Sequence, residues 1–498
     1  MTSLRARMAS GAQWTISIRI VERVIGFATT LILARLLVPA DFGVVAMGTA
    51  IYGILASLTE FGFTQALIRM RRPRPDAYST AFTLHAMMSA AVALSLVALT
   101  PVASAFYRDS RVVVVLLTLA TISLVSGLRN FGMARYERAM DFRPFFVMTL
   151  ARKASSFLVG VGIALLVADY RALLGGMLIG TVVDIALTYR LTKFRPRFTL
   201  AYKKEVLGFS AWWLASRLAA MFGKRGMDLL IGQQLGAAAL GKYAVALDLA
   251  TMPTAEIVAP VMRAVFPGYM QMKDEVGRLY SAFLRVWGVI ALTAIPAAVG
   301  TACVAEQLTS VLLGPKWHEA AQLIGALAII GAIEALNSCY WPMMLTRVGP
   351  KTVFMLSALG VILTVPAFGA ALWWFGLMAA LAAWIVCSTL MLLLGAKLLV
   401  KDLGGSLKPL LRGLLRPVAG ASLMAATVLA AQRVLPNANS WPGEFGLLLL
   451  LVVCGALVYS LTVWIFWLLS GRPETAEREL VSLAQARLSK LLGRVEAD

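Results

Sequence analysis

The sequence predicts an all-α polytopic membrane protein: about fourteen transmembrane helices, forming two six-helix lobes in parallel repeat plus two C-terminal helices. Three observations support this. Of the 498 residues, 60% are hydrophobic, and the mean hydropathy of +0.80 lies outside the range of soluble domains. The apolar stretches have the roughly 20 residues that a membrane span needs. The segments between them alternate between many basic residues and few.

Taken in order, the apolar stretches give fourteen predicted spans, at 12–37, 42–68, 78–105, 112–134, 145–168, 172–190, 208–232, 239–268, 280–303, 319–345, 352–372, 374–396, 413–432 and 445–470. With an inside N-terminus, the inside segments hold about 29 Lys and Arg and the outside loops about five. Merging the two spans that meet at Gly369–Phe375 would move Lys397, Lys401 and Lys408 to the outside. The asymmetry therefore favours fourteen spans with both termini cytoplasmic.

The two halves show a weak internal repeat. Leu33–Ile51 aligns without gaps to Ile231–Leu249, so that Gly43 meets Gly241. Both segments join the first two spans of a half that starts inside, which predicts a parallel repeat about an axis along the membrane normal. Chance similarity between apolar helices is the alternative. The predicted domains are a six-helix lobe at 1–192, a basic cytoplasmic linker at 193–207, a six-helix lobe at 208–400, two additional helices at 401–472 and a cytoplasmic amphipathic tail at 473–498.

Charged residues lie inside several predicted spans. A charge near the bilayer centre costs about 2.5–3.5 kcal/mol, so it normally faces a partner helix or a wet cavity. The candidate cavity cations, which suit an anionic cargo, are Arg19, Arg23, Arg129, Arg152, Lys153, Arg217, Lys224 and Arg225. Pairing is the alternative: Glu22 with Arg19 or Arg23, and Asp228 with Lys224 or Arg225. Snorkelling of Arg19, Arg152 and Arg217 to the inner surface is another.

Acidic residues within the spans are candidates for ion coupling, because a buried carboxyl can bind and release a proton during a transport cycle. They are Glu60, Asp184, Asp228, Asp248, Glu256 and Glu334. Helix ends and polar interfaces explain the same residues without coupling. Pro253 and Pro260 interrupt the predicted eighth span and could form a hinge or only a static curve.

Composition excludes several functional classes. The four cysteines are widely spaced and the two histidines are isolated, so neither a metal site nor another cofactor is expected. The net charge of +21 follows from basic inside loops, and no soluble domain is present to bind nucleic acid. No P-loop motif is present, so ATP hydrolysis by this chain is not expected.

Three ordered segments carry a resemblance to a known family. They are FGFTQALIRMRRPRPDAYSTAF at Phe61–Phe82, ARYERAMDFRPFF at Ala134–Phe146 and MDLLIGQQLGAAALGKY at Met227–Tyr243. Together they resemble the bacterial polysaccharide transporter family of the multidrug/oligosaccharidyl-lipid/polysaccharide (MOP) exporter superfamily, the Wzx-like lipid-linked oligosaccharide flippases. The resemblance covers roughly Arg5 to Val400. It implies that two lobes enclose a central cavity and export a polyprenyl-pyrophosphate-linked repeat unit from the inner to the outer leaflet.

The expected function is therefore that of a flippase, not an enzyme, in exopolysaccharide, capsule or O-antigen (lipopolysaccharide) synthesis. Its expected partners are the lipid-linked oligosaccharide, membrane lipids, and polymerases and glycosyltransferases of the pathway. Two alternatives stay open. A drug/cation antiporter of the same superfamily should favour acids over cations in its spans. A membrane polysaccharide polymerase or ligase should carry a sizeable outside loop, whereas the outside loops here are short.

Overall fold

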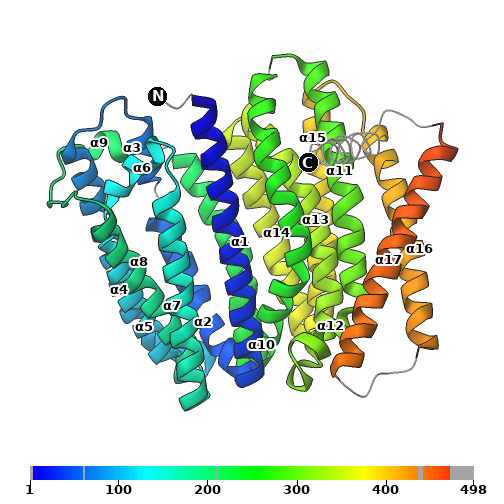
Figure 1. Ribbon diagram of the computed structural model, residues 1–498, viewed down its shortest axis with the longest axis horizontal. Coiled ribbons are helices and arrows are strands. Elements are labelled where there is room, and N and C mark those ends of the chain that lie inside the picture. The colour runs from blue at the N-terminus through cyan, green and yellow to red at the C-terminus, as the bar shows by residue number, and fades with distance from the viewer. Residues whose placement is uncertain (1–3, 60–61, 208–210, 273, 436–440, 472–498) are drawn as a thin grey trace, which may run out of the picture. The chain divides into compact units, whose positions relative to one another are not determined.

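The computed structural model describes residues 4–59, 62–207, 211–272, 274–435 and 441–471, whose regular structure is helical (Figure 1). This confirms the all-α prediction. The chain divides into two compact units, Met1–Ala244 and Val245–Asp498. The domain boundaries inferred from the sequence remain predictions, and the amphipathic tail at 473–498 lies outside the described residues.

The first unit is built from long helices connected by short ones. α1 packs on α7, α7 on α8, α4 on α5, and both α2 and α8 also pack on α5. The elements are α1 (Leu4–Leu36), α2 (Pro39–Ala56), η1 (Ser57–Thr59), α3 (Phe63–Arg69), α4 (Pro75–Tyr107), α5 (Arg111–Gly127), η2 (Phe131–Met133), α6 (Ala134–Arg138), α7 (Arg143–Val167), α8 (Arg171–Leu191), α9 (Lys203–Leu207) and the first part of α10 (Ala211–Gln271).

The second unit begins within α10 and is centred on α11, which packs on α13 and α16. α13 packs on α15, α14 on α15, and α16 on α17. Its other elements are α11 (Val276–Cys303), α12 (Ala305–Leu312), η3 (Pro315–Trp317), α13 (Ala320–Arg347), α14 (Pro350–Phe375), α15 (Leu377–Asp402), α16 (Lys408–Val434) and α17 (Trp441–Leu469).

By length and composition, eleven of the described helices could cross a membrane, or up to twelve if the bent pair 111–127 and 131–138 is one span. α1 is not among them, because every stretch of its apolar part long enough to span includes several charges. The stretch Leu218–Met262 counts once, although its 45 residues would extend about 68 Å as a straight helix, twice the thickness of a bilayer core. A multi-span membrane protein is confirmed, whereas the number fourteen remains a prediction.

Two glycines mark the breaks between consecutive helices. Gly376, at φ 84°, separates α14 from α15, so the predicted split near Gly369–Phe375 exists but lies slightly later in the chain. Gly236, at φ 77° and ψ −177°, interrupts α10 in the same way. Both residues take a left-handed φ that glycine adopts without the strain of a Cβ. The break in α10 supports two separate helical arms where the sequence predicts the seventh and eighth spans.

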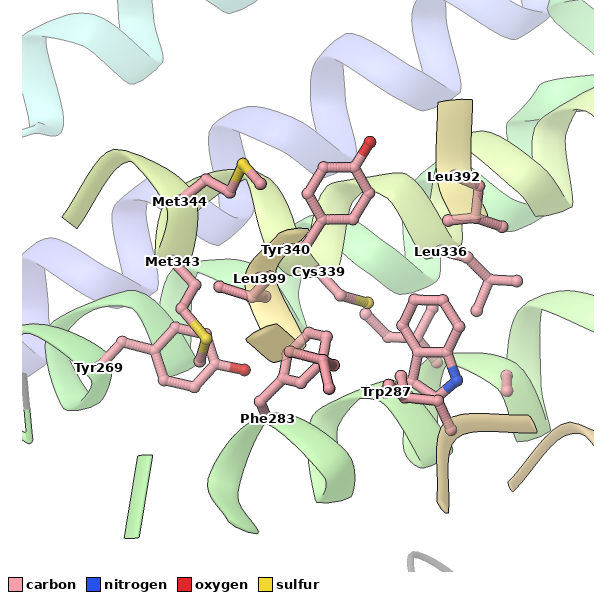
Figure 2. Packing of buried hydrophobic residues seen from close by; sticks show 14 of the residues in the cluster. Tyr269, Phe283, Trp287, Leu336, Cys339, Tyr340, Met343, Met344, Leu392 and Leu399 are labelled. Atoms are coloured by element: carbon pink, nitrogen blue, oxygen red, sulfur yellow. The ribbon is translucent and has the colours of Figure 1, made fainter. Parts of the chain in front are cut away.

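Apolar packing in the second unit surrounds α13. Figure 2 shows Tyr269 of α10, Phe283 and Trp287 of α11, and Cys339 and Tyr340 of α13 gathered in one buried cluster. α16 and α17 add to this unit through a smaller cluster with α12. The Tyr459 hydroxyl on α17 also donates a hydrogen bond to the Leu292 carbonyl of α11 (2.8 Å), which connects α17 to the rest of the unit.

Candidate functional site

The first unit contains a cluster of charges on and beside its long helices. Glu22 on α1 accepts a hydrogen bond and forms an ion pair with Arg152 on α7 at 2.8 Å, and each side chain is about two fifths exposed. α1 and α7 pack directly together, so this pair joins two neighbouring helices. The sequence suggested Arg19 or Arg23 as the partner of Glu22. In the structure, Glu22 forms an ion pair with a residue of another helix, Arg152 of α7.

Further charges surround this pair. Lys153, the next residue on α7, interacts electrostatically with both Glu22 and Arg152, and its Nζ lies 3.6 Å from where a Cβ would stand on Gly26 of α1. Asp184 on α8 is half-buried and lies within the field of Arg152 and of Arg129. Arg129, between α5 and η2, is exposed. The structure thus brings four predicted site residues together around Glu22.

Arg19 and Arg23 stand on the same helix as Glu22. The Arg19 side chain is exposed, whereas that of Arg23 is half-buried. With Arg129, Arg152 and Lys153 they make five cations against three acids, Glu22, Asp184 and Glu137, the last of which interacts electrostatically with Arg129. This part of the first unit therefore carries a surplus of positive charge.

A cavity of about 240 Å³ continues from the cluster between α1, α2, α7 and α8. Ser156 lies one helical turn beyond Arg152, and Thr29 one turn beyond Gly26, so the cavity begins where the charges end. Its wall is largely apolar and includes Leu33, Phe42 and Gly160. The volume falls below the 300–1,000 Å³ of pockets that enclose drug-sized ligands, so an oligosaccharide does not fit inside it.

A second group of predicted residues lies on α10. Arg225 forms an ion pair with buried Asp228 at 3.0 Å, and its Nε lies 3.1 Å from where a Cβ would stand on Gly53 of α2. Tyr107 of α4 lies close enough to interact electrostatically with Asp228. Arg225 is thus paired locally, as the structural alternative expected, whereas the neighbouring Lys224 has an exposed side chain.

Close backbone contacts connect α2 with the middle of α10. A Cβ on Gly43 would overlap the backbone of Ala237, and a Cβ on Gly241 would overlap the backbone of Pro39. Gly43 aligns with Gly241 in the sequence repeat and Pro39 aligns with Ala237. The same contact is therefore made twice, with the two repeat-related segments exchanged. We call these four residues the glycine seam.

The remaining acidic and proline candidates with described positions lie in the second unit. Asp248, Glu256 and Glu334 are exposed, and Pro253 and Pro260 lie in continuous helix, because the break in α10 is at Gly236. Glu60 and the Arg217 side chain lie outside the described residues. The assignments of all predicted site residues to substrate binding, coupling or hinge motion therefore remain proposals. No group of three or more metal-ligating side chains occurs in the described part of the chain.

Comparison with known proteins identifies the family. The family model described as polysaccharide biosynthesis protein matches residues 32–322, more than half of the chain. The chain belongs to this family. The matched residues include the glycine seam, Arg152 and the Arg225–Asp228 pair, whereas Glu22 lies before them.

Curated relatives of this family member come from several bacteria. The chain is 20% identical over 373 residues to the lipopolysaccharide biosynthesis protein WzxC of Escherichia coli, covering 73% of this chain and 75% of the relative. It is 24% identical over 341 residues to the teichuronic acid biosynthesis protein TuaB of Bacillus subtilis, covering 68% and 70%. It is 26% identical over 339 residues to the succinoglycan biosynthesis transport protein ExoT of Rhizobium meliloti, covering 67% and 68%.

Solved structures show which fold this family member shares. The lipid II flippase MurJ, in an inward closed conformation, matches with a TM-score of 0.74 and 11% identity, over 92% of this chain and 99% of that one. An inward-facing multidrug resistance MATE transporter of the MOP superfamily matches with a TM-score of 0.64 and 12% identity, over 77% and 94%. The chain therefore has a MurJ- and MATE-like fold.

Sequence reasoning missed Tyr107 and Gly53, which form the surroundings of the Arg225–Asp228 pair. Tyr107 is buried, and its hydroxyl donates to the Met47 carbonyl of α2 at 3.3 Å. The isolated tyrosine at the end of α4 gives no spacing signal, and its partner lies 60 residues away. Only the packing of α2, α4 and α10 in this family member brings these residues together.

Proposed function

We propose that this protein is a flippase that moves polyprenyl-pyrophosphate-linked oligosaccharide repeat units from the inner to the outer leaflet of the bacterial cytoplasmic membrane. Membership of the polysaccharide biosynthesis family and relatives named for lipopolysaccharide biosynthesis and succinoglycan transport support this proposal. The fold shared with a lipid II flippase supports it further. The products we assign to its pathway are exopolysaccharide, capsule or O-antigen.

The observation that carries the proposal is the cation surplus around the Glu22–Arg152 pair. A pyrophosphate must lose hydration to cross hydrocarbon, at a cost of several kcal/mol or more. Fixed guanidinium and ammonium groups at membrane depth offset that cost, and a guanidinium can donate two parallel hydrogen bonds to phosphate. A transporter of organic cations would be hindered by the same charges, so this surplus favours an anionic head group over a cationic drug.

The ion pair gives Arg152 a fixed position. Glu22 restrains one side of its guanidinium, so less side-chain entropy is lost when a phosphate binds to the other side. Lys153 adds a second positive charge next to it. We assign the pyrophosphate to Arg152, Lys153 and Arg23. The sugars are placed outside the 240 Å³ cavity, which is too small for them.

The remaining parts of the proposal concern mechanism and setting. We assign an alternating-access cycle, with Asp184 as the first candidate for ion coupling because it is half-buried beside Arg152 and Arg129. Both termini are placed in the cytoplasm by the charge asymmetry of the loops. The chain acts as a transporter rather than an enzyme, and glycosyltransferases that build the repeat unit and a polymerase that consumes it are its expected pathway partners.

A transport assay in proteoliposomes tests the proposal. Purified protein is reconstituted with a fluorescent polyprenyl-pyrophosphate oligosaccharide, and outer-leaflet exposure is measured by quenching with a membrane-impermeant reagent. Wild-type protein should accelerate exposure, and the double variant Arg152→Gln with Lys153→Gln should slow it at least tenfold. Arg433→Gln, at the end of α16 in the second unit, is the control and should transport normally. Equal rates for the double variant and wild type would refute the cation assignment; no acceleration by wild type over empty vesicles would refute flipping of this lipid.

A further inference from the structure

The connection between α8 and α9 is anchored along the start of α4. We call residues 192–202 the strap. Its backbone amides donate hydrogen bonds to hydroxyls on one face of α4: Arg197 to Ser79 at 3.3 Å and Thr199 to Thr83 at 3.0 Å. A third, from Tyr202, reaches Thr80 at 3.3 Å. An extended segment bonded at alternate residues to one helix has a defined path, so its side chains point in defined directions.

Aromatic side chains reinforce this anchoring. Phe194 of the strap lies 5.8 Å from Tyr78 of α4, and Phe198 lies 5.5 Å from Phe82, measured between ring centroids. The guanidinium of Arg135 on α6 stacks over both Tyr78 and Phe194, at 5.0 and 5.1 Å. Aromatic pairs and a cation stacked on a ring both stabilise the contact beyond the apolar area that they bury.

Neighbouring loops join the strap in one platform. Figure 1 shows α3, α6 and α9 gathered at one end of α4, and Val206 of α9 is buried with Phe63 and Leu67 of α3. Arg138 of α6 donates to the carbonyls of Leu67 and Met70 at 2.7 Å, which fixes the end of α3. The loop from α3 to α4 therefore has a defined position beside α9.

The platform is strongly basic, and its exposed cations in segments 69–76 and 190–205 form no ion pairs with described acids. In the segments 69–76 and 190–205 the only exposed acids are Asp76 and Glu205. None of the cations of these segments forms an ion pair with a described acid. The exposed cations are Arg69, Arg71, Arg72, Arg74, Arg190, Lys193, Arg195, Arg197, Lys203 and Lys204. Ten cations against two acids make a surface that attracts an anion from outside the protein.

The same surface exposes apolar side chains. Phe198 is 76% exposed and Leu200 42% exposed, between Arg197 and Lys203. α4 has 33 residues and is about 50 Å long, which exceeds a hydrocarbon core of about 30 Å. Its first turns, where the strap is bonded, therefore reach the head-group level. An exposed phenyl ring gains no apolar contact from a soluble polyanion. At the boundary between head groups and acyl chains, the same ring can be buried.

We propose that the strap and its adjoining loops form a binding surface for anionic phospholipid head groups of the inner leaflet, separate from the pyrophosphate site at Arg152. The cations contact lipid phosphates while Phe198 and Leu200 enter the upper acyl region. Each Lys or Arg near an anionic membrane surface adds to the attraction, so a cluster of them binds more strongly than one alone. The surface holds the first unit at a fixed depth in the membrane, and the strap, being bonded to α4, transmits that position to the helix.

Native mass spectrometry of the full-length protein in detergent micelles tests this surface. The protein is titrated with dioleoylphosphatidylglycerol or with dioleoylphosphatidylcholine, and the retained lipids are counted. Wild type should retain the glycerol lipid preferentially. The triple variant Arg197→Gln, Lys203→Gln, Lys204→Gln should weaken its binding at least tenfold. A matched triple variant of inner cations in the second unit, Lys401→Gln, Lys408→Gln, Arg412→Gln, should retain most of it.

Further variants separate the possible results. Phe198→Ser keeps every charge and should also weaken retention, because part of the surface is apolar. The single variant Arg197→Lys keeps the positive charge and should retain the glycerol lipid as wild type does. Thermal unfolding checks that each variant is folded, and the pair Lys203→Gln, Lys204→Gln replaces the triple variant if that one is not. Equal retention of both lipids by wild type, equal loss in the two triple variants, or complete displacement of the glycerol lipid by inorganic pyrophosphate would overturn the proposal.

Discussion

At the scale of single residues, Glu22 shows how helix geometry selects the partner of an intramembrane charge. Arg23 is adjacent in sequence and points to another side of the helix, and Arg19 is exposed. Arg152, 130 residues away, reaches Glu22 because α1 and α7 pack together. The Arg225–Asp228 pair could be predicted from its spacing of three residues along one helix. The Glu22 pair could not, because the register between α1 and α7 is not encoded in local spacing.

We expect Glu22→Gln to destabilise the folded protein by about 1 kcal/mol, the size of interhelical polar interactions in membranes. It leaves Arg152 with no carboxylate at 2.8 Å. The double variant Glu22→Gln with Arg152→Gln should lose less than the sum of the two single variants, because both remove the same interaction. Unfolding in detergent measures each free energy. Arg19→Gln is the control and should change stability by less than about 0.5 kcal/mol; strict additivity of the pair would contradict the coupling.

At the scale of elements, small residues determine where helices end and how closely they approach. The hydropathy pattern predicts the helices, and the breaks fall at Gly236 and Gly376, where a left-handed φ is needed. The glycine seam requires that Gly43 and Gly241 have no Cβ, because each lies against the backbone of the facing segment. The repeat alignment could predict that Gly43 and Gly241 are equivalent. It could not predict that each contacts the segment containing the other, since that follows from how α2 packs against α10.

Gly43→Ala should prevent the seam from forming. The added Cβ would overlap the backbone of Ala237, which no change of rotamer relieves, and overpacking of this kind costs about 1–3 kcal/mol. If closure of the seam is a step of the cycle, transport in proteoliposomes should fall by tenfold or more while expression is kept. Gly162→Ala in α7 is the matched control, since open space surrounds that position. Normal transport by Gly43→Ala would show that the cycle does not use this contact.

The loop before α5 gives the first unit a pH-dependent contribution. Arg111 donates to Asp109 at 2.8 Å, and this hydrogen bond lowers the pKa of the Asp109 carboxyl. The folded pKa lies below the unfolded value of about 3.9, so the contribution is complete above that value and is lost as pH falls through the folded pKa. Asp109→Asn should therefore lower stability at pH 7, by less than about 1 kcal/mol, and the difference from wild type should disappear at sufficiently acid pH.

Thermal unfolding of both proteins between pH 7 and pH 3 measures this difference. Asp169→Asn is the control, because the corresponding ion pair of Asp169 with Arg171 before α8 is longer, at 3.6 Å, and more exposed. Its effect at pH 7 should be smaller. A destabilisation by Asp109→Asn that stays constant down to pH 3 would contradict a role of the charged carboxylate.

At the scale of the whole molecule, composition and charge asymmetry could predict a multi-span membrane protein, and ordered segments could indicate the family. The fold shared with MurJ and a MATE transporter agrees with both. The number of spans was harder to predict. α1 carries several charges in every stretch that is long enough to span a membrane. The two predicted spans on either side of Gly236 belong to one helix, α10, which breaks at that glycine. These exceptions lie where the proposed function needs them: charges for the cargo in α1, and a sharp bend beside the seam in α10.

A motion of the whole molecule is the last expectation. If access alternates, the segments of the glycine seam must touch in one state and separate in the other. Val38 and Ala238 flank Pro39 and Ala237 and are both exposed, so a cysteine at each is accessible to an oxidant. We expect the pair Val38→Cys with Ala238→Cys to crosslink and to stop transport in proteoliposomes. Reduction should restore transport, because the crosslink holds one state and leaves the cations of the first unit in place.

The background cysteines are replaced first, since Cys303, Cys387 and Cys454 are partly accessible. Each single cysteine variant, oxidised in the same way, is the control and should transport normally before and after reduction. A crosslink that forms fully and leaves transport unchanged would mean that the seam stays closed throughout the cycle. The cargo would then have to pass without separation of α2 from α10, and a mechanism that opens this side of the protein at the seam would be excluded.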